Sequence, residues 1–387
     1  FMEEMQLHTP PLFELILPMT TSGQRLFWLR SKYSEIVKAF EFVKEPGPSD
    51  IDLIPLVEDP DLMLDANKLL EEYVSYCTRS SFKKFKVDYL RPFIARSDPA
   101  QNSGLVPAVV SAKAALSRFA EFSESSSIPT YPIIGVGCLP FRGRLSPESV
   151  SQFEKEYPGI RTVTIQSAFR ADFPESKVKD AISSLNSGLN SRPRVFDADE
   201  MEKIRQLNKI FSPIYRRTIE DLAVINDIAR YVPARRERKL HIGLLGYSRS
   251  VGKLKLPRAI TFTSAFYSLG VPPEFIGIGR GIKKAQEVHL LDFLLETYLY
   301  LKEDLQFAGH FLNKGNLEAL SKNSKAWSGI KEDVLLAEDL LSLEFGPRTH
   351  EHQIYRNVTS NIRLLLEEKK DPSSDLLKAA EIRRSLG

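Results

Sequence analysis

The chain has 387 residues, of which 42% are hydrophobic, and its 53 basic and 50 acidic residues leave a net charge of only +3. This balance gives no global attraction for nucleic acid, and the apolar runs are too short and interrupted to cross a bilayer. The two cysteines, Cys77 and Cys138, cannot build a disulfide scaffold, so the composition fits a reducing compartment such as the cytoplasm.

The first part of the chain alternates between short apolar runs and stretches with helical spacing. Strands are predicted at Phe13–Met19, Asp52–Glu58, Tyr89–Arg96, Tyr131–Cys138, Thr162–Phe169 and His241–Tyr247, with Glu274–Gly279 as a seventh candidate. Helices are predicted at Gly23–Val43, Leu62–Thr78, Gly104–Phe122, Pro147–Tyr157, a pair over Ala198–Tyr231, and Arg258–Leu269. A repeated strand-then-helix order is typical of a parallel sheet or barrel.

From about Gln286 onward the strand pattern disappears. Helices are predicted at Leu290–Leu312, Lys331–Leu343, Ile354–Lys369 and Ser374–Ser385. We therefore predict an α/β fold in which residues 1–285 form a TIM-like (β/α) barrel. Residues 286–387 form an all-helical extension packed on that barrel.

Charged residues follow five of the predicted strands. Glu58 and Asp98 come after two consecutive strands, and arginines come after others. The active site of a β/α barrel lies where its strands end. Two acids can hold a divalent metal, and arginines can hold an anion through paired donors. The pattern predicts a metal-dependent enzyme that acts on a small, multiply charged anion.

Each of these residues also has an ordinary structural interpretation. An acid at a strand end is most often a helix N-cap or a surface charge, and Asp98 would suit a cap. Arg142 and Arg144 fit a solvated loop, and Arg170 fits an ion pair with a neighbouring acid. Arg258 is different, because the apolar helix around it favours a buried anion contact.

Two further features have mainly structural interpretations. Cys138 stands at the end of an apolar strand, where a core residue is more common than a nucleophile. The glycine-rich run Gly277–Gly281 (GIGRG) resembles a phosphate-binding loop only weakly. A tight turn into the helical extension is the default interpretation of this run.

Six long stretches, distributed in order along nearly the whole chain, resemble the archaeal-type phosphoenolpyruvate carboxylases. They are ELILPMTTS (Glu14–Ser22), GVGCLPFRGRLSPES (Gly135–Ser149), TVTIQSAFRADFP (Thr162–Pro174), HIGLLGYSRS (His241–Ser250), LPRAITFTSAFYSLGVPPEFIG (Leu256–Gly277) and RRSLG (Arg383–Gly387). Shorter stretches are similar to the bacterial and plant branch. IPLVED (Ile54–Asp59) resembles its PLFET motif and RSDPAQNSG (Arg96–Gly104) its YSDSxKDxG motif, whose acids bind the metal.

The resemblance implies a reaction in which phosphoenolpyruvate and bicarbonate give oxaloacetate and phosphate. Bicarbonate attacks the phosphorus to form carboxyphosphate and an enolate, and the released CO2 then reacts with the enolate. Mg2+ or Mn2+ stabilises the enolate oxygen. The resemblance also implies a cytoplasmic homotetramer, with no nucleic acid or membrane partner.

The same resemblance assigns roles to individual residues. Glu58 and Asp98 are the expected metal ligands. Phosphate and carboxylate favour planar bidentate donors, which suits arginine better than lysine. The expected catalytic and substrate-binding side chains are Arg142, Arg144, Arg170, Arg249, Arg258 and Gln101. The basic loop Ser250–Leu256, with Gly252, resembles a shortened form of the family's lid, which would keep water from the enolate.

The chain also departs from the family pattern. It contains no His-Pro dipeptide, whose His acts on the phosphate proton in the family. The family also has a longer segment before the ELILPM strand. We expect the chain as printed to fold into most of a barrel, and an upstream extension to add stability and activity. Gln101 stands where the bacterial branch has Lys, and Arg142 where it has His.

Two alternatives therefore remain open at this point. One is another enolate-forming barrel lyase of the phosphoenolpyruvate/pyruvate type, which would make or break a C–C bond. The other is a non-catalytic subunit.

Overall fold

The computed structural model describes residues 12–40, 50–80, 84–189, 191–222, 224–233, 250–251 and 254–387. Within these ranges the fold is α/β and mostly helical, with one five-stranded parallel sheet and a two-stranded hairpin. The predicted strand His241–Tyr247, Arg249 and Gly252 lie outside the described residues. Closure of the sheet into a barrel therefore stays a prediction.

The sheet confirms the first five predicted strands. Its order follows the sequence, and each neighbouring pair is parallel. Its strands are β1 (Glu14–Leu17), β2 (Asp52–Val57), β3 (Phe93–Ala95), β4 (Ile133–Gly135) and β5 (Thr162–Val163). In β2 the residues Leu53, Ile54 and Val57 are buried, so consecutive positions face the interior. A strand covered on both faces is typical of a parallel sheet.

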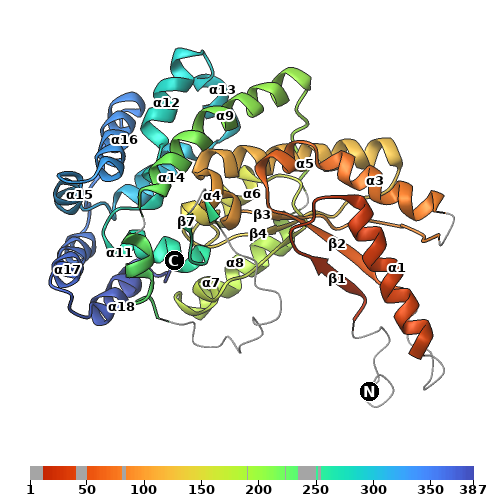
Figure 1. Ribbon diagram of the computed structural model, residues 1–387, viewed down its shortest axis with the longest axis horizontal. Coiled ribbons are helices and arrows are strands. Elements are labelled where there is room, and N and C mark those ends of the chain that lie inside the picture. Colours follow the sequence, from red (N-terminus) through yellow and green to blue (C-terminus); the bar gives the residue numbers. More distant parts are fainter. Residues whose placement is uncertain are drawn as a thin grey trace.

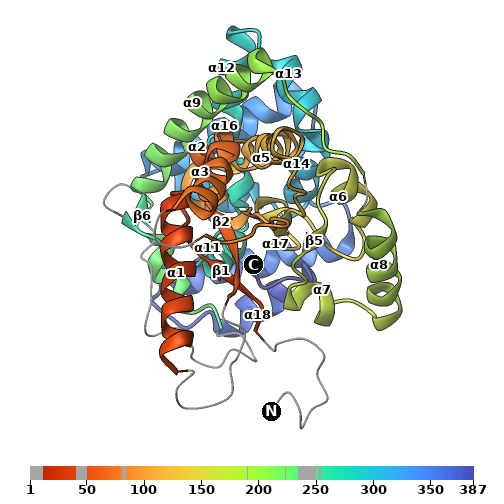
Figure 2. The same ribbon diagram turned by 90° about the vertical axis from the view of Figure 1, so that its right-hand side faces the viewer.

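Helices follow each of the five strands (Figures 1 and 2). They are α1 (Gly23–Phe40), α2 (Pro60–Leu64), α3 (Ala66–Arg79), α4 (Ser97–Ser103), α5 (Leu105–Ser126), α6 (Val150–Glu156), α7 (Ser167–Ala171), α8 (Glu175–Gly188), α9 (Ala198–Glu220) and α10 (Val224–Ala229). Helices α1 and α5 pack directly on the sheet. Helix α5 contacts β3, α3 and α9, and its first thirteen residues are buried. A helix that is buried all round belongs to the core.

The rest of the chain is helical apart from the β6 (Ser250–Val251) and β7 (Leu254–Lys255) hairpin. Figure 1 shows the last helices gathered on the side of the molecule opposite α1. They are α11 (Ala259–Ser268), α12 (Ile278–Glu287), α13 (Leu291–Thr297), α14 (Leu301–Gly309), α15 (Lys314–Ser321), α16 (Lys325–Leu341), α17 (His350–Glu367) and α18 (Ser373–Ile382). No described helix is long and apolar enough to cross a membrane.

The candidate strand at Glu274–Gly279 is wrong. A short 3-10 helix, η2 (Pro273–Phe275), is followed by α12, which begins at Ile278. Gly277 has a φ of +76°, and its amide donates to the buried Asp333 carboxylate at 2.8 Å. Asp333 also accepts from the amide and guanidinium of Arg280. The glycine-rich run is thus a tight turn whose amides bind a carboxylate of the chain itself.

The single helix predicted at Leu290–Leu312 is also wrong, because the chain forms α13 and α14 with a break between them. At the break the amides of Leu299 and Tyr300 donate to the buried carboxylate of Glu156, at 3.4 and 3.0 Å. Tyr298 is buried, and its hydroxyl donates to Asp304 at 2.5 Å. These tertiary hydrogen bonds interrupt a stretch whose local sequence favours one helix.

Helix α8 occupies a segment rich in Ser and Asn, a composition that is typical of a link between elements. Its buried residues are Val178, Ala181 and Leu185. This spacing makes a single narrow apolar stripe, and the polar residues face outward. The helix packs against α6 and α7 through that stripe.

We predict that Gly279→Ala destabilises the protein. A Cβ at this position would lie 2.1 Å from the carbonyl oxygen of Asp333, so α12 and α16 would have to separate. We expect a loss of about 1–3 kcal/mol or more in the free energy of unfolding, measured by urea denaturation. Gly315→Ala is the control, because it is exposed and its nearest atom lies 3.4 Å away. The control should be neutral or gain up to about 1 kcal/mol. Equal stabilities of the two variants would contradict this prediction.

Candidate functional site

Polar residues gather at the carboxyl edge of the parallel sheet. Val57 of β2 is paired with Ile94 of β3, and Ala95 of β3 with Gly135 of β4. Glu58, Arg96 and the segment after Gly135 therefore leave the sheet at the same edge. In parallel α/β sheets this edge is where ligands bind.

Glu58 and Asp98 occupy neighbouring positions at this edge. Glu58 directly follows β2, is half-buried, and accepts from the amide of Met19 at 2.9 Å. Asp98 is the second residue of α4, the helix that follows β3 after Arg96, and is also half-buried. The N-cap of α4 is Arg96, so Asp98 lies in the first turn and is not the N-cap. The described residues contain no group of three or more His, Cys, Asp or Glu that could hold a metal.

Arg142 is a buried residue and not a solvated loop residue. It ends the 3-10 helix η1 (Pro140–Arg142) and is only 4% exposed. Its guanidinium donates to Ser97 Oγ at 3.1 Å, to Gln166 Oε1 at 2.8 Å, and to the backbone oxygen of Gly387. Arg142 thus joins the segments that follow β3 and β5 to residue 387.

Arg144 lies in a different environment. Its guanidinium pairs with the buried Asp304 and lies over the ring of Phe307, 5.1 Å from the centroid. It lines a pocket together with Arg96, Glu156 and Asp304. None of the residues Glu58, Asp98 and Arg258 lines that pocket. The role of Arg144 in substrate binding stays a prediction.

Arg258 is held indirectly by α4. It is the N-cap of α11, and its carbonyl accepts from the Phe262 amide at 2.8 Å. The preceding residue, Pro257, accepts from the buried Gln101 side chain at 2.6 Å. Gln101 and Asp98 belong to the same helix, so α4 positions the start of α11. The guanidinium of Arg258 is exposed, whereas the apolar helix around it predicted a buried contact with an anion.

The other predicted residues are less informative. Arg170 is exposed on α7. Cys138 is buried, and burial raises the pKa of its thiol to about 12, which confirms the core interpretation over a nucleophile.

The sequence patterns did not indicate Glu274, whose carboxylate binds the backbone next to Arg142. It is fully buried, and its carboxylate accepts from the Phe141 amide at 2.9 Å and from the Tyr267 hydroxyl at 2.8 Å. Burial raises the pKa of Glu274 to about 7, although both hydrogen bonds oppose the shift. The available signal was a lone acid inside the apolar run GVPPEFIG. Buried charged groups of this kind often belong to functional sites.

We predict that Glu274→Gln becomes more stable relative to the natural protein as pH rises. A carboxyl with a raised pKa binds its proton more tightly in the folded chain, so its burial lowers stability as pH increases from about 4.5 to about 7. Glutamine does not titrate, and it can accept the same two hydrogen bonds. The difference in unfolding free energy should therefore shift by roughly 3 kcal/mol in favour of the variant between these limits. Urea denaturation at pH 5 and pH 8 measures it, and the exposed Glu124→Gln should show no shift. A constant difference for Glu274→Gln would contradict the prediction.

Comparisons with known proteins agree with the resemblance of the motifs. A family model described as phosphoenolpyruvate carboxylase matches residues 1–387. A protein of Metallosphaera sedula named phosphoenolpyruvate carboxylase is 39% identical over 396 residues, which cover 97% of this chain and 76% of that protein. Relatives of the same name from Oenococcus oeni and Caldivirga maquilingensis are each 36% identical over 397 residues. The matches cover 100% and 97% of this chain, respectively, and 76% of each relative. The chain therefore belongs to the phosphoenolpyruvate carboxylase family.

Proposed function

We propose that this protein converts phosphoenolpyruvate and bicarbonate into oxaloacetate and phosphate at the carboxyl edge of its parallel sheet. The observation that carries the proposal is the match of the family over the whole chain. The geometry supports it, because Glu58, Asp98 and the Arg142 segment leave the sheet at one edge. In this reaction a bicarbonate oxygen attacks phosphorus and the phosphorus–enol oxygen bond breaks. The carboxyphosphate then releases CO2 and phosphate, and the enolate carbon forms a bond to that CO2.

Glu58 and Asp98 would hold the divalent cation, Mg2+ or Mn2+. Both are half-buried oxygen donors at the ends of neighbouring strands, which suits a hard cation. When bound, the cation would stabilise negative charge that develops on the enolate oxygen. Mg2+ commonly takes only one or two carboxylates and fills its other positions with water and phosphate oxygens. A pair of acids is therefore sufficient.

The arginines would divide the remaining work. Arg258 supplies an exposed guanidinium at the N-terminal end of the ten-residue helix α11, where backbone amides also favour an anion. Arg142 lies near this helix, because its partner Gly387 packs against the Ile260 carbonyl. We assign Arg258 to substrate binding and Arg142 to holding the site together. Arg144, Arg170, Arg249 and Gln101 remain candidates for further contacts.

The family relationship also supports three larger-scale proposals. The sheet would close into a (β/α) barrel over residues 1–285, with residues 286–387 as its helical extension. The protein would assemble as a homotetramer, and it would act in the cytoplasm.

Release of both phosphate and oxaloacetate from phosphoenolpyruvate, bicarbonate and Mg2+ tests the function. Phosphate release without oxaloacetate, or no reaction, would count against the carboxylase.

We predict that Glu58→Gln and Asp98→Asn each abolish most metal-dependent carboxylation. Each change removes a charged oxygen ligand while keeping the size of the side chain. The losses in kcat/KM should be on the order of a hundredfold or more, because the cation offsets charge in the transition state. The exposed Glu124→Gln and Asp180→Asn are matched controls that should retain activity. Unchanged dependence on Mg2+ concentration in the two site variants would refute the metal assignment.

We predict different outcomes for lysine at Arg258 and at Arg142. Arg258→Lys should lower kcat/KM by about tenfold to a hundredfold and leave the melting temperature unchanged, because this side chain is exposed. Arg142→Lys should lower both, because an ammonium cannot serve Ser97, Gln166 and Gly387 together. The exposed Arg79→Lys is the control. Near-normal turnover of Arg258→Lys would remove that residue from the substrate site.

A further inference from the structure

A fully buried arginine, Arg96, has most of its hydrogen-bonding capacity unused. It directly follows β3 and has no exposed surface. Its Nε donates to the hydroxyl of Tyr157 at 2.9 Å. Its two terminal nitrogens have no hydrogen-bond partner among the described residues. A buried guanidinium without a partner is costly, so a missing ligand is a physical explanation of its position.

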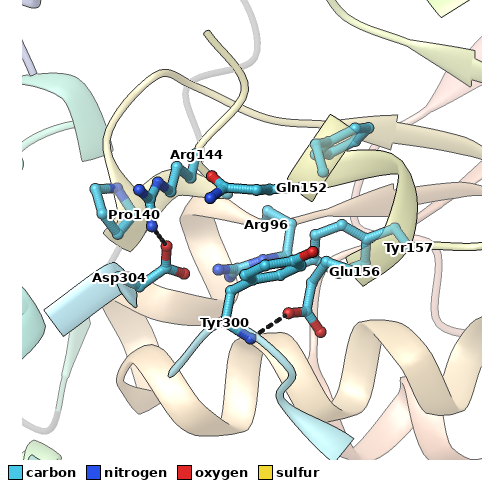
Figure 3. A pocket seen from close by; sticks show the side chains of 10 residues that line it. Arg96, Pro140, Arg144, Gln152, Glu156, Tyr157, Tyr300 and Asp304 are labelled. Atoms are coloured by element: carbon cyan, nitrogen blue, oxygen red, sulfur yellow. Dashed lines mark hydrogen bonds and ion pairs between the residues drawn. The ribbon is translucent and has the colours of Figure 1, made fainter. Parts of the chain in front are cut away.

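The guanidinium faces a small pocket near the surface. The pocket has a volume of about 20 Å3 and is lined by Arg96, Arg144, Gln152, Glu156, Tyr300 and Asp304, among others. In Figure 3 the guanidinium of Arg96 lies among Asp304, Tyr300 and Glu156. Gln152, Tyr300 and Arg144 are partly exposed and form the rim, whereas Arg96, Glu156 and Asp304 are buried and form the floor. A cavity of this size holds a water or a ligand of a few atoms.

The two acids of the pocket already have partners. Asp304 pairs with Arg144 and accepts from the Tyr298 hydroxyl. Glu156 pairs with the buried Lys113 at 2.7 Å and accepts from the amides after α13. The cluster therefore contains three cations, Arg96, Arg144 and Lys113, against two anions. One negative charge would neutralise it.

We propose that this pocket binds a small, planar, singly charged oxyanion of the formate and bicarbonate class. The two free nitrogens of Arg96 form a fork that matches two oxygens of a planar anion. The pocket volume excludes a large ligand, and Glu156 and Asp304 would repel a second negative charge. The fork alone would also fit phosphate, but the pocket volume and the two acids disfavour a phosphate dianion.

The position of Arg96 gives this ligand a structural effect. The next residue, Ser97, accepts from Arg142 at 3.1 Å, and Asp98 follows it. An anion on Arg96 therefore fixes residues 96–98, which belong to the carboxyl edge of the sheet. Because the anion binds the folded chain alone, it should raise the melting temperature.

The test is a thermal unfolding series in sodium formate, compared with sodium chloride and sodium phosphate at equal pH and ionic strength. Formate is the main probe because it is not a substrate of the proposed reaction, and bicarbonate is the second probe. We expect a saturable rise of the melting temperature in formate that chloride does not give. Bicarbonate and phosphate can also bind the proposed substrate site, so their effect is assigned to this pocket only where Arg96→Lys removes it. If formate and chloride give the same melting temperature, the pocket holds only water and the proposal is wrong.

Three variants locate the binding. Arg96→Lys keeps the charge but removes the fork, so it should lose the formate-specific rise, whereas the exposed Arg79→Lys should keep it. Arg258→Lys alters the proposed substrate site and should also keep the rise. Loss of the rise in Arg258→Lys, or its retention in Arg96→Lys, would overturn the assignment to this pocket.

If Arg96→Lys does not fold, a substitution at the rim of the pocket tests the same proposal. Gln152→Glu adds a negative charge at the partly exposed rim without changing the buried floor. It should raise the formate concentration needed for half-saturation several-fold. An unchanged formate affinity in Gln152→Glu would contradict the proposal. These measurements use unfolding alone, so their outcome is independent of whether the protein carboxylates phosphoenolpyruvate.

Discussion

The buried guanidinium of Arg142 is the interaction on which the arrangement of the site depends. It brings together Ser97, Gln166 and Gly387, which are distant in the sequence. Its own segment is held from both sides. The Arg142 carbonyl accepts from the Gly137 amide at 2.8 Å, and the Phe141 amide donates to Glu274. Burying a charge is costly unless its donors are satisfied, so the loops that satisfy it are fixed in place.

The helical half of the molecule is joined to the sheet through charged groups as well as apolar packing. Glu156 and its partner Lys113 are each only 6% exposed at the side chain, and burial lowers the pKa of Lys113. The same Glu156 accepts the amides that end the regular helix after α13. A buried carboxylate with three donors, Lys113 and the amides of Leu299 and Tyr300, has few alternative arrangements. Removing one partner would leave an uncompensated charge, which costs more than the pair contributes.

Local patterns predicted the sheet because each strand is a short apolar run, and they placed Glu58 and Asp98 near the ends of two neighbouring strands. The role of these two acids as metal ligands stays a prediction. Local patterns failed where a contact with a residue distant in the sequence determines the structure. The stretch around Tyr298 has a helical pattern, but Glu156 and Asp304 interrupt it. The burial of Arg142 and Glu274 depends on loops that meet only in the folded chain. The apolar sequence after Arg258 does not show that its guanidinium points outward from the helix start.

The unsatisfied charged groups are not scattered evenly through the interior. Buried polar atoms without a partner occur in four charged residues of the described chain, Arg96, Glu154, Glu274 and Arg383. Three of these four adjoin the Arg142 network: Arg96 precedes Ser97, Glu274 holds Phe141, and Arg383 donates to Leu386 at 2.7 Å. Folding alone would favour partners for all of these atoms. A site that must bind anions requires donors that the chain itself leaves unused, because interactions already satisfied in the free protein cannot stabilise a ligand or transition state. The unused donors of Arg96 and Arg383 beside this network are therefore a physical sign that this edge of the sheet is organised for ligands, at the expense of stability.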